Sequence, residues 1–238
     1  MTASTSSDEP ASIPIGPSSD SGRQALATAV RRLMAATVSS VASSELLADA
    51  TATLSAVADQ LERHLPESDG VGASRYAADN AGGDATSNLA DVMPFDVVIG
   101  PCNPVALPLL IEFDPPKAIG NATFTSTYEG APGCVHGAVL AGAFDLVLTA
   151  ANVIAGAAGP TVTLTIRYLQ PTVINRPARF EGWVTSIEGR RIHSRGQLIQ
   201  AGVVTVEAVG EFVTMDRSRI VSMHRRGGGG GGGGGGGS

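Results

Sequence analysis

The chain has 238 residues, of which 43% are hydrophobic and 16% are charged, so it is able to bury a real core. Its formal net charge is −6 and its pI is near 5.2. This acidic balance argues against nucleic acid as the main partner, because phosphate binding needs a basic face. Lys117 is the only lysine, so any cationic site is expected to use arginine, which suits bidentate phosphate contact.

Cysteine usage and hydropathy limit the cellular compartment and the kinds of metal site that we expect. Cys102 and Cys134 are too few for a disulfide framework and lack the spacing of metal ligands, so no metal site is expected. The amino-terminal segment is rich in Ser, Pro and Asp and contains no recognisable signal peptide. No uninterrupted apolar run approaches the roughly 20 residues of a membrane span. We therefore expect a cytoplasmic protein without a membrane span.

The amino-terminal part of the chain has a helical pattern. Residues 22–65 repeat apolar side chains at spacings of three and four, which predicts two helices, at about 22–41 and 44–65. Ser43 offers an N-cap between them. The segments around this hairpin are rich in turn-forming and small residues. We expect a disordered N-terminus at 1–21, a linker at 66–92 and a tail at 217–238 that contains a poly-glycine run.

The remainder of the chain alternates between strand patterns and one very apolar helix, which is expected from Val135 to about Ala155. A helix that is hydrophobic on all sides must be covered on most of them, and a curved antiparallel sheet wrapped around it does so. We therefore predict an α+β hotdog fold for residues 93–216, with a tight hairpin turn at Glu188-Gly189. The expected strands are 95–99, 107–113, 118–128, 161–169, 178–187, 190–200 and 203–214.

Asp145 is the strongest chemical signal, because it is a lone carboxylate within the apolar helix. Burial of such a group is costly unless it has partners or lines a wet cleft. Asp145 is therefore a candidate acid/base residue. The alternative is a structural aspartate that is satisfied by hydroxyls such as that of Thr149, one turn further along the helix.

His136 and Gly137 open the same helix. The N–H of Gly137 lies at the positive end of the helix dipole, where it could stabilise an oxyanion. The alternative is that Pro132-Gly133 forms a turn and Gly137 has only a packing role. Gly137 and Asp145 differ by roughly 12 Å along one helix, so they cannot touch the same carbonyl. If both serve one site, each meets its partner from a second subunit, which implies a dimer.

Thr161 is expected at the start of a strand, on the same face as Thr163, Thr165 and Arg167. Its hydroxyl could hold Asp145 or an attacking water, but threonine is also a good strand residue. Four arginines could bind phosphate groups. These four are Arg167, Arg190, Arg191 and Arg195. For Arg190 and Arg191, which lie beside the hairpin turn, a solvent-exposed pair with no ligand is the commoner explanation.

Several motifs resemble one known family. Residues 128–138, Tyr-Glu-Gly-Ala-Pro-Gly-Cys-Val-His-Gly-Ala, followed by Asp145, resemble the signature of the PaaI/thioesterase-superfamily group of hotdog acyl-coenzyme A (acyl-CoA) thioesterases. Residues 100–104 and 167–172 resemble two further motifs of a branch that looks actinobacterial, in which a leading helical pair also occurs. The likeness covers about residues 95–215. Ala138 stands where the signature has a second glycine.

The resemblance implies roles for individual residues. Gly137 would bind the thioester carbonyl through its amide, Asp145 would be the catalytic carboxylate, and His136 and Thr161 would assist. The coenzyme A (CoA) end of the substrate would follow a strand and a cluster of cationic residues. The resemblance places Arg167 and Leu169 on the strand that lines the CoA channel, and Arg190 and Arg191 where relatives contact the phosphates.

The implied reaction is hydrolysis of an acyl-CoA to the free acid and CoA, as expected of an enzyme of lipid metabolism. Asp145 either activates water or attacks directly, and both routes stay open. The chain is expected to form a homodimer or a dimer of dimers, with no cofactor beyond the CoA of its substrate. Two rivals remain: a non-catalytic acyl-CoA-binding hotdog protein, and a hotdog enoyl-CoA hydratase or dehydratase.

Overall fold

A computed structural model describes residues 17–65 and 89–214, and the expectations for 1–16, 66–88 and 215–238 lie outside the described residues. In chain order the elements are α1 (Pro17–Ser39), α2 (Ser44–Glu62), α4 (Leu89–Val92), β1 (Leu109–Asp114), β2 (Lys117–Thr123), the 3-10 helix η1 (Ser126–Tyr128), α5 (Gly137–Ile154), β3 (Thr161–Tyr168), β4 (Pro177–Glu188), β5 (Arg191–Gln200) and β6 (Val203–Val213).

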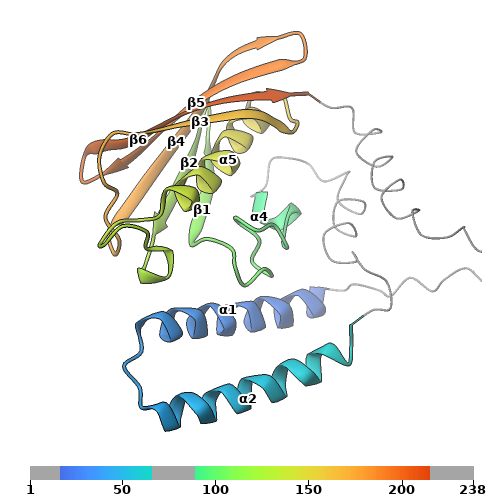
Figure 1. Ribbon diagram of the computed structural model, residues 1–238. Coiled ribbons are helices and arrows are strands. Elements are labelled where there is room, and N and C mark those ends of the chain that lie inside the picture. The colour runs from blue at the N-terminus through green and yellow to red at the C-terminus, as the bar shows by residue number, and fades with distance from the viewer. Residues whose placement is uncertain (1–16, 66–88, 215–238) are drawn as a thin grey trace, which may run out of the picture.

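One antiparallel sheet and the helix α5 form the main domain. The strands lie in the order β1-β2-β4-β5-β6-β3, and α5 packs across one face of the sheet (Figure 1). β4 ends at Glu188 and β5 begins at Arg191, and Gly189 between them has a φ of 60°, as a tight hairpin turn requires. The predicted hotdog fold and the predicted turn are both confirmed.

A row of small residues crosses the sheet beneath α5. Ala118, Gly182, Gly196 and Ala208 are consecutive partners across β2, β4, β5 and β6. A Cβ atom on Gly182 would lie only 3.0 Å from the carbonyl oxygen of Val147 in α5. The row therefore lets the helix lie closer to the sheet than larger side chains would permit.

Aromatic side chains fill the rest of the space between helix and sheet. Phe144 of α5 and Phe180 of β4 are fully buried, and their ring centroids lie 5.1 Å apart in an edge-to-face arrangement. Phe124, just after β2, meets Phe180 in the same way at 6.3 Å. Such pairs add to the burial of apolar area, so the aromatic contacts fix where α5 lies along the strands.

By length and composition, α5 is the one helix among the described residues that could cross a membrane. Half of it is buried within the domain, where it packs mainly against β4 and β2. Both properties are those of a core helix, so its hydropathy is accounted for by the hotdog architecture.

The two predicted amino-terminal helices are present, with different bounds. α1 begins at Pro17 rather than at residue 22, since proline is well accommodated in the first turn of a helix. Ser43 caps α2, and its Oγ accepts a hydrogen bond from the Leu46 N–H at 3.3 Å. α2 ends at Glu62, three residues before the predicted end at Leu65.

The prediction of a strand at 95–99 is wrong. Asp96 folds this segment into turns, because its Oδ1 accepts hydrogen bonds from the N–H groups of Val98 and Ile99, at 2.8 and 3.0 Å. Asp96 also accepts the Gly100 N–H through its carbonyl. A short acidic side chain that bonds its own backbone competes with the sheet ladder.

The predicted linker is too long at its C-terminal end. Leu89, in the short helix α4, is 6% exposed and belongs to the same core as α5, and Val92 packs against that core. The folded domain therefore begins before residue 93, because two apolar side chains in an otherwise polar stretch are enough to anchor one helical turn.

A β-bulge near the start of β3 changes the face on which Thr161 lies. Thr161 pairs with Phe212 and Thr163 pairs with the preceding residue of β6, Glu211, so Val162 is the extra residue of a bulge. Phe212 is buried on the inner face, and Thr161 therefore also faces α5. The prediction that Thr161 shares a face with Thr163, Thr165 and Arg167 is wrong for this reason.

We predict that Gly182→Ala lowers the free energy of unfolding by about 1–3 kcal/mol, because its Cβ must displace α5 or the Val147 side chain. The measurement is urea denaturation. Gly22→Ala is the matched control, because nothing lies within 4 Å of its Cβ position. It should leave stability unchanged or raise it by up to about 1 kcal/mol through helix propensity. Equal stabilities for Gly182→Ala and the native chain would contradict the tight packing.

Candidate functional site

The Asp145 carboxylate lies on a partly exposed side of α5 and is held from β3. The Thr161 hydroxyl donates a hydrogen bond of 2.6 Å to Asp145 Oδ1. The Thr149 hydroxyl donates instead to the backbone carbonyl of Asp145, at 2.8 Å, so it does not satisfy the carboxylate. Among the described residues, Asp145 Oδ2 has no hydrogen-bond partner. Asp145 is therefore oriented by one hydroxyl and keeps one oxygen available.

The side of α5 that carries Asp145 is only partly covered by its own chain. Ala138, Ala141, Gly142, Asp145 and Thr149 recur at helical spacing, and each is partly or fully exposed. The residues between them are mostly buried against the sheet. α5 thus presents one stripe of small residues to its surroundings, and Asp145 is the only charged group in that stripe.

His136 and Tyr168 hold the first peptide of α5 from two sides. His136 is the N-cap, and its Nδ1 accepts a hydrogen bond from the Ala138 N–H at 3.0 Å. A neutral imidazole that accepts through Nδ1 carries its proton on Nε2. The Tyr168 hydroxyl donates to the Gly137 carbonyl at 2.8 Å. The peptide unit between Gly137 and Ala138 is therefore fixed at both its oxygen and its nitrogen.

The Gly137 N–H is left free by this arrangement. Gly137 is the first residue of α5, so its N–H has no acceptor within the helix, and no acceptor elsewhere in the described residues bonds to it. The N–H lies at the positive end of the helix dipole. A free backbone donor at such a place can stabilise negative charge on a carbonyl oxygen.

A hollow of about 720 Å³ opens beside this donor, between the loop before α5 and the end of β3. Two features shape the loop. Glu129 Oε1 accepts the Gly133 N–H at 2.5 Å, and Gly130 lies so near His136 that a Cβ would come within 2.9 Å of its Cα. The lining residues are Glu129, Gly130, Ala131, Cys134, Val135, His136, Gly137, Leu140, Tyr168, Leu169, Gln170, Pro171 and Thr172.

Tyr128 braces the same loop from behind. Its carbonyl accepts the His136 N–H at 2.8 Å, and its hydroxyl donates to the Ala106 carbonyl at 3.3 Å. Burial raises the pKa of Tyr128 above its ordinary value of 10.0, and the nearby charge of Arg31 offsets part of that rise. Tyr128 therefore remains a protonated donor at neutral pH and keeps His136 in its capping position.

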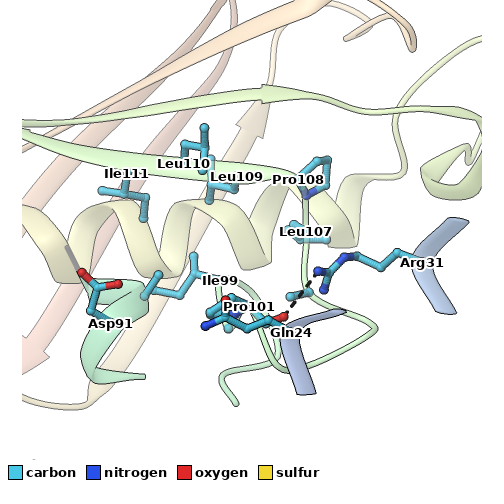
Figure 2. A pocket seen from close by; sticks show the side chains of 13 residues that line it. Gln24, Arg31, Asp91, Ile99, Pro101, Leu107, Pro108, Leu109, Leu110 and Ile111 are labelled. Carbon is cyan, nitrogen blue, oxygen red and sulfur yellow. Dashed lines mark hydrogen bonds between the residues drawn. The ribbon is translucent and has the colours of Figure 1, made fainter. Parts of the chain in front are cut away.

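A separate hollow of about 530 Å³ lies between α1 and β1, away from the residues that the sequence predicts (Figure 2). Arg31 reaches across from α1 and donates hydrogen bonds to the carbonyls of Asn103 and Pro101, at 2.8 and 3.3 Å. Apolar residues of the β1 region, such as Leu109 and Ile111, form the opposite wall. Arg31 thereby holds α1 against the main domain.

The structure places Arg167 and Arg195 in one hollow, but three of the four predicted arginines already have partners within the chain. Arg167 pairs with Glu207 at 3.0 Å, Arg191 pairs with Glu211, and Arg190 donates to the Thr214 carbonyl. Arg195 is exposed, has no partner among the described residues, and lines a hollow of about 290 Å³ on the outer face of the sheet with Arg167 and Trp183. Leu169, by contrast, lies in the hollow beside Gly137.

Gly137 and Asp145 do not meet within one chain. Their separation of eight residues on a regular helix corresponds to about 12 Å of rise, with different faces presented. Each forms its own cluster, with Tyr168 and Thr161 respectively. Across residues 17–65 and 89–214, no three His, Cys, Asp or Glu side chains lie close enough to hold a metal ion.

Tyr168 is the residue that sequence reasoning missed as part of the site. The alternation of β3 carried a signal, because Leu164 and Ile166 face the core and Tyr168 continues that face. A tyrosine at this position is ordinarily taken as core, and nothing local indicates that its hydroxyl reaches the first carbonyl of α5.

Comparison with known proteins places the chain in a family. The sequence model of the thioesterase superfamily matches residues 132–207, which contain both clusters. A solved thioesterase superfamily protein, RHA08564, is 32% identical to the chain with a TM-score of 0.68, and the match covers 80% of this chain and 94% of that protein. The chain belongs to the thioesterase superfamily. The comparison with curated proteins found no match.

Two further solved structures match this chain over less of its length. Zebrafish thioesterase superfamily member 2 is 17% identical with a TM-score of 0.43, covering 45% of this chain and 82% of that one. A mutant of the phenylacetic acid degradation protein PaaI from Thermus thermophilus is 15% identical with a TM-score of 0.43, covering 46% and 95%.

The likeness to RHA08564 extends beyond the hotdog domain of the present chain. A coverage of 80% of 238 residues is about 190 residues, whereas residues 89–238 number only 150 (238 minus 88). At least part of the amino-terminal region is therefore shared with that protein.

We predict that Tyr168→Phe lowers the free energy of unfolding by about 1 kcal/mol, the usual net worth of a neutral hydrogen bond. The measurement is urea denaturation of the full chain. Thr165→Val is the control, because it removes a hydroxyl from the outer face of the same strand and should change stability by less than about 0.5 kcal/mol. If Tyr168→Phe matches Thr165→Val, the Tyr168 hydroxyl does not hold the Gly137 carbonyl in solution.

Proposed function

We propose that the chain is an acyl-CoA thioesterase that forms a two-fold dimer, with each site made of Asp145 from one copy and the Gly137 amide from the other. Membership of the thioesterase superfamily supports thioester hydrolysis in general terms. The separation of Gly137 and Asp145 on one helix supports a site that two copies share.

The observation that carries the proposal is the free edge of β3. Among the described residues β3 lies at the end of the strand order and pairs only with β6, so no described strand pairs with the backbone groups on its other side. Thr161, at one end of the strand, holds Asp145, and Tyr168, at the other end, holds Gly137. Antiparallel pairing of β3 with its own copy sets Thr161 of one chain beside Tyr168 of the other. The two half-sites then meet.

The chemistry follows from the two groups. The Gly137 N–H donates to the thioester carbonyl oxygen and stabilises the oxyanion as the carbon becomes tetrahedral. In one route Asp145 takes a proton from water while the water oxygen bonds to the carbonyl carbon. The carbon–sulfur bond then breaks, and the CoA sulfur leaves and takes up a proton. The products are the free acid and CoA.

In the other route an Asp145 oxygen attacks the carbonyl carbon and expels the CoA sulfur, which gives a mixed anhydride that water then hydrolyses. Thr161 serves both routes, because it holds Oδ1 and leaves Oδ2 to face the substrate. His136 serves both routes as the N-cap that fixes the peptide after Gly137. Neither route requires a metal or a redox cofactor.

For the CoA phosphates we propose the arginines at the end of the sheet where Thr161 lies. Arg191 pairs with Val213, next to the Phe212 position that pairs with Thr161, and Arg190 is its neighbour in the hairpin turn. Arg195 and Arg167 lie further along the outer face of the sheet. Guanidinium groups contact phosphate bidentately, so Arg167, Arg190 and Arg191 would exchange their present partners for substrate, whereas Arg195 would bind it directly. Leu169 is proposed to contact the substrate in the hollow beside Gly137.

A thiol-release assay over short, long and aromatic acyl-CoAs tests the proposal. Steady release of CoA thiol from at least one of them supports hydrolysis. Tight binding of acyl-CoAs without any release would favour a binding protein and contradict the proposal. Hydration of an enoyl-CoA without thiol release would favour a hydratase and would equally contradict it.

We predict that Asp145→Ala lowers the rate of thiol release by at least about 100-fold, the usual contribution of an acid/base group. Asp91→Ala is the matched control, because Asp91 is exposed and lies at the hollow near α1, away from both clusters. That variant should keep the native rate. Near-native hydrolysis by Asp145→Ala, in protein with the native mass and circular dichroism, would overturn the assignment.

A further inference from the structure

The helix α2 has no buried residue, although its sequence is amphipathic. Its apolar side chains Leu46, Leu47, Leu54, Val57 and Leu61 are between 42% and 59% exposed. Figure 1 shows α2 on the far side of α1, away from the sheet and α5. The described part of the chain therefore leaves the apolar side chains of α2 about half exposed.

An isolated helix of this length is only marginally stable in water, and most helices in proteins owe their stability to a packed apolar face. We call the side of α2 formed by Leu47, Leu54, Val57 and Leu61 the α2 stripe. Its residues are spaced by seven, three and four, so they share one side of the helix. Contiguous exposed apolar surface of this kind indicates a partner.

The charges on the two helices narrow the choice of partner. Residues 44–62 contain four acidic side chains and no basic one, which disfavours an anionic lipid surface or nucleic acid. α1 has the opposite balance, with three arginines against one aspartate over residues 17–39, although Arg31 and Arg23 contact the main domain. Arg32 of α1 is exposed and has no partner among the described residues. The surface that best complements α2 is therefore α1 of another molecule.

We propose that the hairpins of two copies of this chain pack together as an antiparallel four-helix bundle, with the acidic α2 of one copy beside the basic α1 of the other. α1 contributes further exposed apolar side chains, Leu26 and Val38, to the same contact. Two-helix hairpins that each expose one apolar side form four-helix bundles in this way, and a two-fold axis makes the contact self-complementary. The likeness to RHA08564 beyond the hotdog domain agrees with a working role for the hairpin.

The test compares two double variants of the full chain with the same change of charge. Leu54→Asp with Leu61→Asp places carboxylates in the α2 stripe. Ala52→Asp with Ala56→Asp places them on the opposite side of the same helix. Particle mass is measured by light scattering across a dilution series, with circular dichroism as a check on folding. The measurement is of mass and not of thiol release. Because a dimer formed through β3 would affect both variants equally, a difference in mass between the two variants reports the hairpin contact alone.

We expect the stripe variant to dissociate into smaller particles at a concentration at least about tenfold higher than the native chain, because apolar anchors dominate such contacts. The Ala52 and Ala56 variant should dissociate as the native chain does. Identical dissociation of the two variants would overturn the proposal, as would a native chain that is monomeric throughout. Binding of the native chain to phosphatidylcholine–phosphatidylglycerol vesicles, lost in the stripe variant without a change in mass, would assign the stripe to a lipid surface and would also overturn it.

Discussion

Two hydrogen bonds tie the ends of the edge strand β3 to α5, and the proposed chemistry depends on them. Thr161 holds the Asp145 carboxylate at 2.6 Å, and Tyr168 holds the Gly137 carbonyl at 2.8 Å. They fix a candidate base and a free amide donor at opposite ends of one strand. In the proposed dimer each chain contributes two half-sites, and the symmetry of an antiparallel strand pair would join them.

The packing of α5 on the sheet sets the positions of these two hydrogen bonds. The row of small residues beneath α5 lets the helix lie close to the sheet, and the buried Phe144 sets its position along the strands. The bulge at Val162 then turns Thr161 inward, while the regular part of β3 already points Tyr168 at the start of the helix. A shift of β3 by one residue, or a rotation of α5 by half a turn, would break the hydrogen bonds of Thr161 to Asp145 and of Tyr168 to Gly137.

The hotdog fold could be predicted from the sequence because its signals are local: alternating strands, one helix apolar on all sides, and a glycine in a tight turn. Asp145 could be singled out from the sequence because a lone carboxylate in an apolar helix is costly to bury, and its catalytic role stays a prediction. The bulge at Val162 could not, because it exists only in the pairing of β3 with β6. The turn at Asp96 and the contact of Tyr168 with α5 likewise depend on side-chain hydrogen bonds, which the alternation of apolar and polar residues does not reveal.

The most direct test of a site shared by two chains mixes two inactive variants. Chains with Asp145→Ala are refolded or co-expressed with chains carrying Gly137→Pro, since proline is common at the first helical position and removes the N–H. A Cβ at Gly137 would lie 3.0 Å from the Tyr168 hydroxyl, so the Gly137→Pro chain must first show native mass and circular dichroism. A mixed dimer then contains one intact site, so about a quarter of the native activity should return when the chains mix at random. Activity no greater than the sum of the two separate variants would contradict the shared site.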